Sequence, residues 1–80
     1  MRVILTKDEY HYLRTFLNNN NIRGVNRGYE DSPILIVNHL LANEIRNFLG
    51  EELPNHFDSM YKITKTGSII ESLIDKLYIQ

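Results

Sequence analysis

The sequence predicts an α+β domain, with a small mixed three-stranded sheet and three helices on one face, in the order β-α-β-β-α-α. The first observation is a repeat, because residues 3–17 and 35–49 follow the same plan. Each copy has a short apolar run, a polar residue able to cap a helix, and an amphipathic segment that ends Arg-x-Phe-Leu. The second is a further helical pattern near the end of the chain. Two such β-cap-α units need a shared sheet to bury their apolar faces.

The first unit begins with a strand at Arg2–Leu5. Thr6 and Glu9 have the spacing of a capping box, in which each side chain satisfies a free backbone amide at the start of a helix. The apolar residues that follow recur at helical spacing. The helix is expected to end at the run Asn18–Asn21, since asparagine tolerates the left-handed conformation found at helix ends.

The middle of the chain is expected to form a hairpin. Residues Ile22–Tyr29 alternate in part, although Gly24 and Gly28 weaken the strand pattern. Turn-forming residues then lead into Ile34–Val37, a run of β-favouring side chains. Because a helix connects the first strand to Ile22–Tyr29, these two strands are expected to be parallel, which makes the sheet mixed.

In the second unit, Asn38 caps a helix that Gly50 can end and that Pro54 keeps from going much further. A last helix is expected to begin at a second capping box, Ser68 with Glu71. Residues 54–65 are read as a loop. The expected core consists of Val3, Leu5, Leu13, Phe16, Leu17, Ile34, Ile36, Leu41, Ile45, Phe48, Leu49, Ile70, Leu73, Ile74 and Leu77.

Composition limits the possible classes of protein. Eighty residues make one domain, residues 1–80, and the absence of cysteine excludes disulfides and the usual structural zinc site. So small a core favours a partner that covers leftover apolar surface, and a homodimer is expected. No apolar run is long enough to span a membrane and no signal-peptide core is seen, so we expect a cytoplasmic protein with no membrane partner.

No catalytic, cofactor-binding or metal-binding residues are predicted. His11, His39 and His56 are far apart in the sequence and lack a second ligand nearby. Asp31-Ser32 is typical of a turn, and Glu51-Glu52 of a solvated helix end. The glycines do not form a phosphate-binding loop. The chain is therefore expected to be a non-enzymatic protein.

A surplus of large apolar side chains near the C-terminus gives the candidate partner surface, which consists of Phe57, Met60, Tyr61, Tyr78 and Ile79. These residues either close the core or form a surface for an unidentified protein partner. Since no catalytic constellation competes with this interpretation, the sequence favours a protein-binding accessory module.

The alternative is a small nucleic-acid-binding regulator that uses the hairpin. Arg23 and Arg27 could contact phosphates, and Tyr29 could stack on a base. A formal net charge of −1 and the acidic pair that follows Tyr29 make this second choice weaker.

The stretch from Tyr61 to Tyr78, YKITKTGSIIESLIDKLY, resembles the ends of small uncharacterised proteins from phages and prophages of low-GC Gram-positive bacteria. The opening residues 3–10, VILTKDEY, are similar to their starts. The resemblance covers about half of the chain and transfers no site residues. It implies an accessory protein, such as a regulator or an inhibitor of a host protein, that acts by binding another macromolecule.

Overall fold

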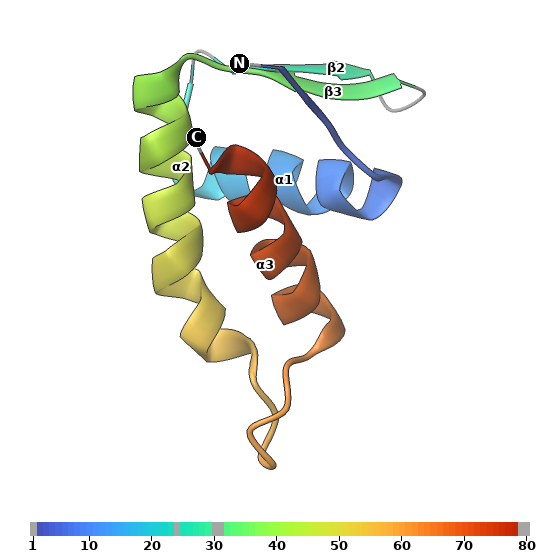
Figure 1. Cartoon of the computed structure of the whole chain (residues 1–80), viewed down its shortest axis with the longest axis vertical. Coiled ribbons are helices and arrows are strands. Elements are labelled where there is room, and N and C mark those ends of the chain that lie inside the picture. The colour runs from blue at the N-terminus through green and yellow to red at the C-terminus, as the bar shows by residue number, and fades with distance from the viewer. Residues whose placement is uncertain (1, 24, 30–31, 79–80) are drawn as a thin grey trace.

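The computed structural model describes residues 2–23, 25–29 and 32–78, and for residues 26–29 and 32 it describes the backbone alone. The α+β class is confirmed. Three helices lie on one side of a small sheet (Figure 1). The elements are β1 (Arg2–Ile4), α1 (Lys7–Asn19), β2 (Asn26–Tyr29), β3 (Ser32–Ile36), α2 (His39–Glu52), the 3₁₀ turn η1 (Leu53–His56) and α3 (Lys65–Leu77). No helix within these ranges is both long and apolar enough to cross a membrane.

The strands are arranged in the order β1-β3-β2, and both pairings are antiparallel. The expectation of a mixed sheet is therefore wrong. Strands β1 and β2 do run in the same direction, but β3 lies between them. The central position suits β3 because it carries the longest apolar run of the three strands, and a central strand is the best covered by the helices below.

The two repeat units fold alike. Their helices begin at caps of nearly identical geometry, Thr6 (φ −77°, ψ 167°) and Asn38 (φ −76°, ψ 167°). The Glu9 amide donates to Thr6 Oγ1 over 3.1 Å, and the Leu41 amide donates to Asn38 Oδ1 over 2.7 Å. The equivalent residues Val3 and Leu35 lie opposite each other in the β1–β3 pair. The predicted capping box and the predicted Asn38 cap are both confirmed.

Two helix boundaries differ from expectation. Helix α2 continues past Gly50, and Pro54 lies in the first turn of η1 instead. Helix α3 begins one turn earlier than the Ser68–Glu71 pattern predicts. Its cap is Thr64, whose Oγ1 accepts from the Gly67 amide over 3.1 Å.

The core lies between the sheet and the three helices. Ten of its members were expected, but Leu35 and Val37 are buried in place of Ile34 and Ile36, and Tyr10 and Ala42 also join it. Leu41 and Ile74 are only partly buried and Phe48 is exposed, so these three expectations are wrong. The buried set is Val3, Leu5, Tyr10, Leu13, Phe16, Leu17, Leu35, Val37, Ala42, Ile45, Leu49, Ile70, Leu73 and Leu77.

One buried carboxylate joins α3 to the first repeat unit. Glu9 is only 1% exposed. It accepts from Lys76 Nζ (2.6 Å) and Ser72 Oγ (2.7 Å) in addition to its capping bond with the Thr6 amide (2.8 Å). Lys76 Nζ also donates to the carbonyl of Ile4 over 3.2 Å, so α3 is bonded to both β1 and α1.

Candidate functional site

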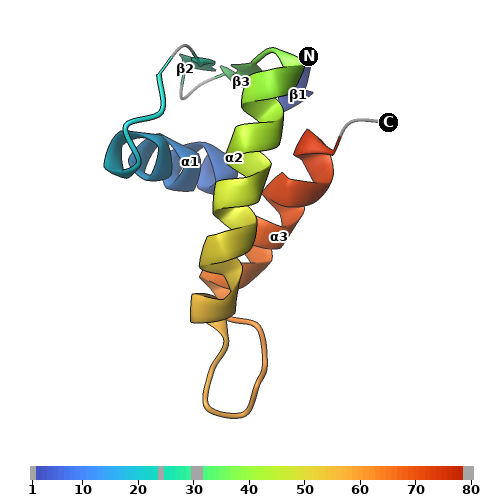
Figure 2. The ribbon, with the colours of Figure 1, turned by 90° about the vertical axis from the view of Figure 1, so that its left-hand side faces the viewer.

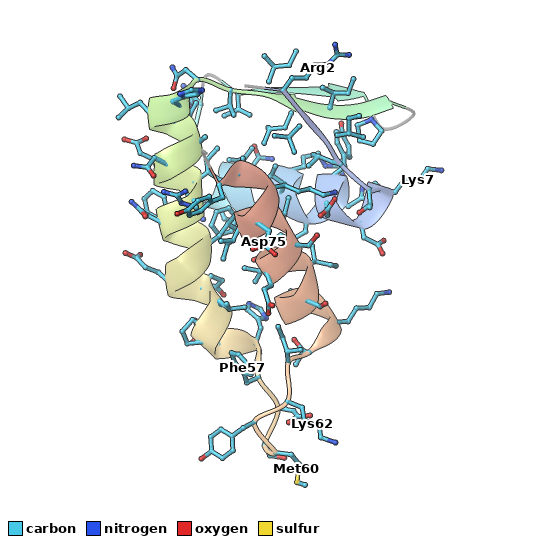
Figure 3. All side chains as sticks on the ribbon, in the orientation of Figure 1. Arg2, Lys7, Phe57, Met60, Lys62 and Asp75 are labelled. Carbon is cyan, nitrogen blue, oxygen red and sulfur yellow. The ribbon has the colours of Figure 1, made fainter. Side chains whose placement is uncertain are left out.

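The most distinctive surface feature is a hairpin loop, residues 57–63, that projects from the end of the molecule opposite the sheet (Figures 1 and 2). It connects η1 to α3. In Figure 3, Met60 marks its tip and Phe57 its base, with Lys62 between them, while Arg2 lies at the sheet end. The loop is therefore well separated from the core, and its conformation depends on its own hydrogen bonds.

The base of the hairpin is fastened to α3. Phe57 and Ile63 form an antiparallel bridge. The carbonyl of His56 accepts from both the amide and Oγ1 of Thr64, each over 2.9 Å. Gly67 in the first turn of α3 is buried against this base, where an added Cβ would lie 2.8 Å from the His56 carbonyl oxygen and 2.7 Å from Ile63 Cγ1. The absence of a side chain at Gly67 lets the helix approach the hairpin closely.

Asp58 organises the turn. Its Oδ1 accepts from the amides of Met60 and Lys62, each over 2.9 Å. The Asp58 amide donates to the Lys62 carbonyl (2.8 Å), and the Asp58 carbonyl accepts from the Tyr61 amide (3.0 Å). Aspartate is favoured at the first position of a type I turn, where its side chain bonds to later backbone amides. These four bonds give the loop one defined conformation.

Tyr61 occupies the position in such a three-residue hairpin that usually belongs to glycine. Its φ of 61° is in the left-handed region, which costs an ordinary side chain about 1–2 kcal/mol. The side chains of Tyr61 and Met60 are also 90% and 73% exposed. An apolar, strained and solvated tip contributes nothing to the core, and such strain concentrates at functional positions.

The structure does not bring the predicted partner surface together. Phe57, Met60 and Tyr61 belong to the hairpin, whereas Tyr78 follows the other end of α3, near the sheet (Figure 1). The Arg46 guanidinium lies 4.9 Å from the centre of the Tyr78 ring, within the range of a cation–π contact. Ile79 lies outside the described residues. Tyr78 is therefore part of a separate surface.

The residues predicted to contact nucleic acid are described only in part. Strand β2 does form at Asn26–Tyr29, but the side chains of Arg27 and Tyr29 are not among those that the structure describes. Arg23 is exposed, and the same cleft that it lines also holds Glu44 and Glu51. This acidic neighbourhood is unfavourable for a phosphate.

Other titratable groups form small, local contacts. His56 Nε2 lies 3.0 Å from Glu52 Oε1, one helical turn away. Burial and, to a smaller extent, the negative charge of Glu52 raise the pKa of Tyr12. Within the described ranges, no three side chains of the metal-ligating kinds lie close enough together to hold an ion.

The apolar residues of the hairpin, Phe57, Met60 and Tyr61, were predicted from the sequence, but Asp58 and Gly67, which hold the hairpin in place, were not. Asp58 was available as a signal, because an aspartate three residues before the end of a short turn is common in hairpins. Gly67 has no such signal, since its role depends on how closely α3 approaches His56.

Comparisons with known proteins found no relative of this chain. No family model matches the chain, and no curated protein or solved structure matches it. The resemblance to phage and prophage proteins stays a prediction.

Proposed function

We propose that the chain is a protein-binding module that presents the tip of its hairpin, Met60 and Tyr61, to an apolar pocket on a partner protein. The observation that carries this proposal is the combination of strain and exposure at Tyr61, in a loop fixed by four hydrogen bonds of Asp58. If stability alone governed this position, glycine or asparagine would suit it better than tyrosine.

The chemistry of the tip suits a protein pocket. Tyrosine supplies a large rigid ring with a hydroxyl that can find a hydrogen-bond partner, and tyrosine is enriched among the residues that dominate binding energy. Methionine adapts its shape to irregular apolar surfaces. Because the turn is already ordered in the free chain, little conformational entropy is lost when the tip is inserted.

Affinity capture with matched variants tests the proposal. The wild-type chain, a tip variant (Met60→Ser with Tyr61→Ser) and a control variant (Tyr78→Ser) are immobilised and exposed to a lysate of the source cells. We expect a protein that is retained by the wild type and by the control but lost with the tip variant. Nuclease treatment of the lysate is expected to leave that capture unchanged.

Two results would contradict the proposal. Equal capture by the wild type and the tip variant would show that Met60 and Tyr61 do not bind the partner. Loss of capture after nuclease treatment would favour the nucleic-acid alternative. Circular dichroism of each variant verifies that the fold is intact, and the tip substitutions are expected to preserve it because neither side chain is in the core.

We also propose that two copies associate through the open face of the sheet. Ile4 is 75% exposed and Ile36 is 48% exposed, and both belong to neighbouring strands on the side away from the helices. Apolar side chains on an uncovered sheet face favour association with a second sheet.

A further inference from the structure

A cleft of about 510 Å³ lies between α2 and the segment that follows α1, and it shares no residue with the hairpin. Figure 2 shows this segment, in cyan, beside the upper part of α2. The apolar part of the lining consists of Ile22, Leu41 and Phe48, and the charged part of Arg23, Glu44 and Glu51. Asparagine side chains from the end of α1 and from α2 complete the wall.

The lining of the cleft includes an aromatic ring that the fold leaves partly exposed. Phe48 and Phe16 are equivalent in the two repeat units, yet Phe16 is 7% exposed and Phe48 is 40% exposed. Ile22 and Leu41 pack against the core and expose the remainder of their surface to the cleft. A partner side chain placed here would bury apolar surface on both molecules.

The charges around Phe48 are unbalanced. Glu44 and Glu51 lie one helical turn before and after Phe48, on the same face of α2. Within the described part of the chain, neither carboxylate has an ion pair or a side-chain hydrogen bond, whereas Glu9 and Glu52 both have one. Arg23 is the single basic residue among the described lining, so the lining carries a net negative charge.

We infer that this cleft binds a short peptide segment with an apolar side chain between basic side chains. The apolar side chain packs against Phe48 and Leu41, and the basic side chains pair with Glu44 and Glu51. Seven residues of helix separate these two carboxylates by about 10 Å, a span that basic residues on either side of a short apolar segment can match. Charge complementarity and the partly exposed ring of Phe48 together select this occupant.

Fluorescence polarisation with a model peptide tests the inference. The probe is a fluorescein-labelled hexapeptide with two central leucines and two arginines at each end, so that its inner arginines are about 10 Å apart when it is extended. We expect saturable binding to the wild-type chain at about 50 mM salt that weakens as the salt concentration is raised. Two control peptides replace either the leucines by serine or the arginines by glutamate, and both are expected to bind at least about fivefold more weakly.

Matched variants separate the cleft from general attraction to an acidic protein. Glu44→Gln with Glu51→Gln should weaken binding about five- to tenfold, since two exposed ion pairs with the probe are lost. Glu71→Gln with Asp75→Asn removes the same charge from exposed positions of α3 and should change the affinity less than about twofold. The tip variant of the hairpin should also bind the probe normally, so failure of one site is distinguishable from failure of the other.

Three outcomes would overturn the inference. The first is an equal loss of probe affinity in the cleft variant (Glu44→Gln with Glu51→Gln) and in the α3 control variant. The second is an unchanged probe affinity in Phe48→Ala. The third is a serine control peptide that binds the wild-type chain as tightly as the probe. Amide chemical shifts give an independent readout. We expect probe-dependent shifts in residues 20–23 and 41–51, and shifts confined to other residues would place the peptide elsewhere.

Discussion

Lys76 Nζ lies 2.6 Å from Glu9 Oε1, although 67 positions separate the two residues in the sequence. The Glu9 side chain is 2% exposed and that of Lys76 34% exposed, so the pair lies at the margin of the core. Glu9 therefore has two roles. It completes the capping box of α1, and it anchors the C-terminal part of α3 to the first repeat unit.

This pair makes stability depend on pH. Burial alone would raise the pKa of the Glu9 carboxyl, but hydrogen bonds from Lys76, the Thr6 amide and Ser72, together with the charge of Lys76, lower that pKa below its ordinary value of 4.5. The unfolded chain thus binds the proton more readily. The contribution of Glu9 is fully present above pH 4.5 and is lost as the pH falls through the lower pKa of the folded state.

Urea unfolding of the wild type and Glu9→Gln from about pH 6 to about pH 3 measures this effect. The difference in unfolding free energy between the two proteins should shrink at the acidic end. Glu71→Gln, an exposed control on α3, should follow the wild type. A difference that stays constant over the whole range would show that the folded-state pKa of Glu9 is not lowered.

Replacing Lys76 tests its contact with Glu9, and a second lysine of α3 provides a matched control. Lys76→Met leaves the buried Glu9 carboxylate without its cation, and we expect a loss of about 1–3 kcal/mol in unfolding free energy near neutral pH. Lys65→Met, at an exposed position of the same helix, should change it by less than about 0.5 kcal/mol. Equal effects would mean that the Glu9 contact adds no stability.

Replacing the glycines of helices α2 and α3 by alanine should change the unfolding free energy in opposite directions. Gly67→Ala places a Cβ 2.8 Å from the His56 carbonyl oxygen, and the resulting overpacking should lower the unfolding free energy by about 1–2 kcal/mol despite the better helix propensity of alanine. In Gly50→Ala no atom lies within 4 Å of the new Cβ, so this variant should raise the unfolding free energy by about 0.5–1 kcal/mol. Chemical denaturation measures both, and a stabilised Gly67→Ala variant would contradict the close approach of α3 to the hairpin.

Tyr61→Gly tests the strain at the tip. Glycine removes the left-handed penalty of about 1–2 kcal/mol but loses about 0.5–1 kcal/mol through the greater freedom of the unfolded chain. The unfolding free energy should therefore stay equal or rise by up to about 1.5 kcal/mol, while capture of the partner is lost. A loss of more than about 1 kcal/mol would show that the Tyr61 side chain stabilises the fold.

The equivalent phenylalanines should differ in their contribution to stability. Phe16→Ala should lower the unfolding free energy by about 3–5 kcal/mol because the ring is buried. Phe48→Ala should lower it by about 1–2 kcal/mol, since part of that ring is already in water. Comparable losses would place both rings in the core.

Self-association is tested by light scattering across a concentration series. We expect the wild type to approach twice the mass of one chain, and Ile36→Lys to remain a monomer because a charge on the open sheet face resists burial. A wild-type monomer at the highest concentration would contradict the homodimer. Helix content by circular dichroism should be the same in both proteins.

The sequence by itself determined the local structure of the two repeat units. Thr6 with Glu9, and Asn38, start their helices where the spacing predicts, because a cap is formed by residues three positions apart and needs no distant partner. The class of the fold also follows from the repeat. The sequence likewise indicated an apolar surplus at Phe57, Met60 and Tyr61, although it did not indicate that a strained turn holds Tyr61 in solvent.

Only the tertiary structure decided which side chains of these elements are buried. Residues 34–37 are all apolar, so their sequence has no polar alternation that would select between the faces of β3, and pairing with β1 buries Leu35 and Val37 instead of Ile34 and Ile36. Equivalent residues acquire different roles for the same reason. Phe16 is buried and Phe48 opens into a cleft because their environments come from elements far away in the chain, as does the lysine that reaches Glu9.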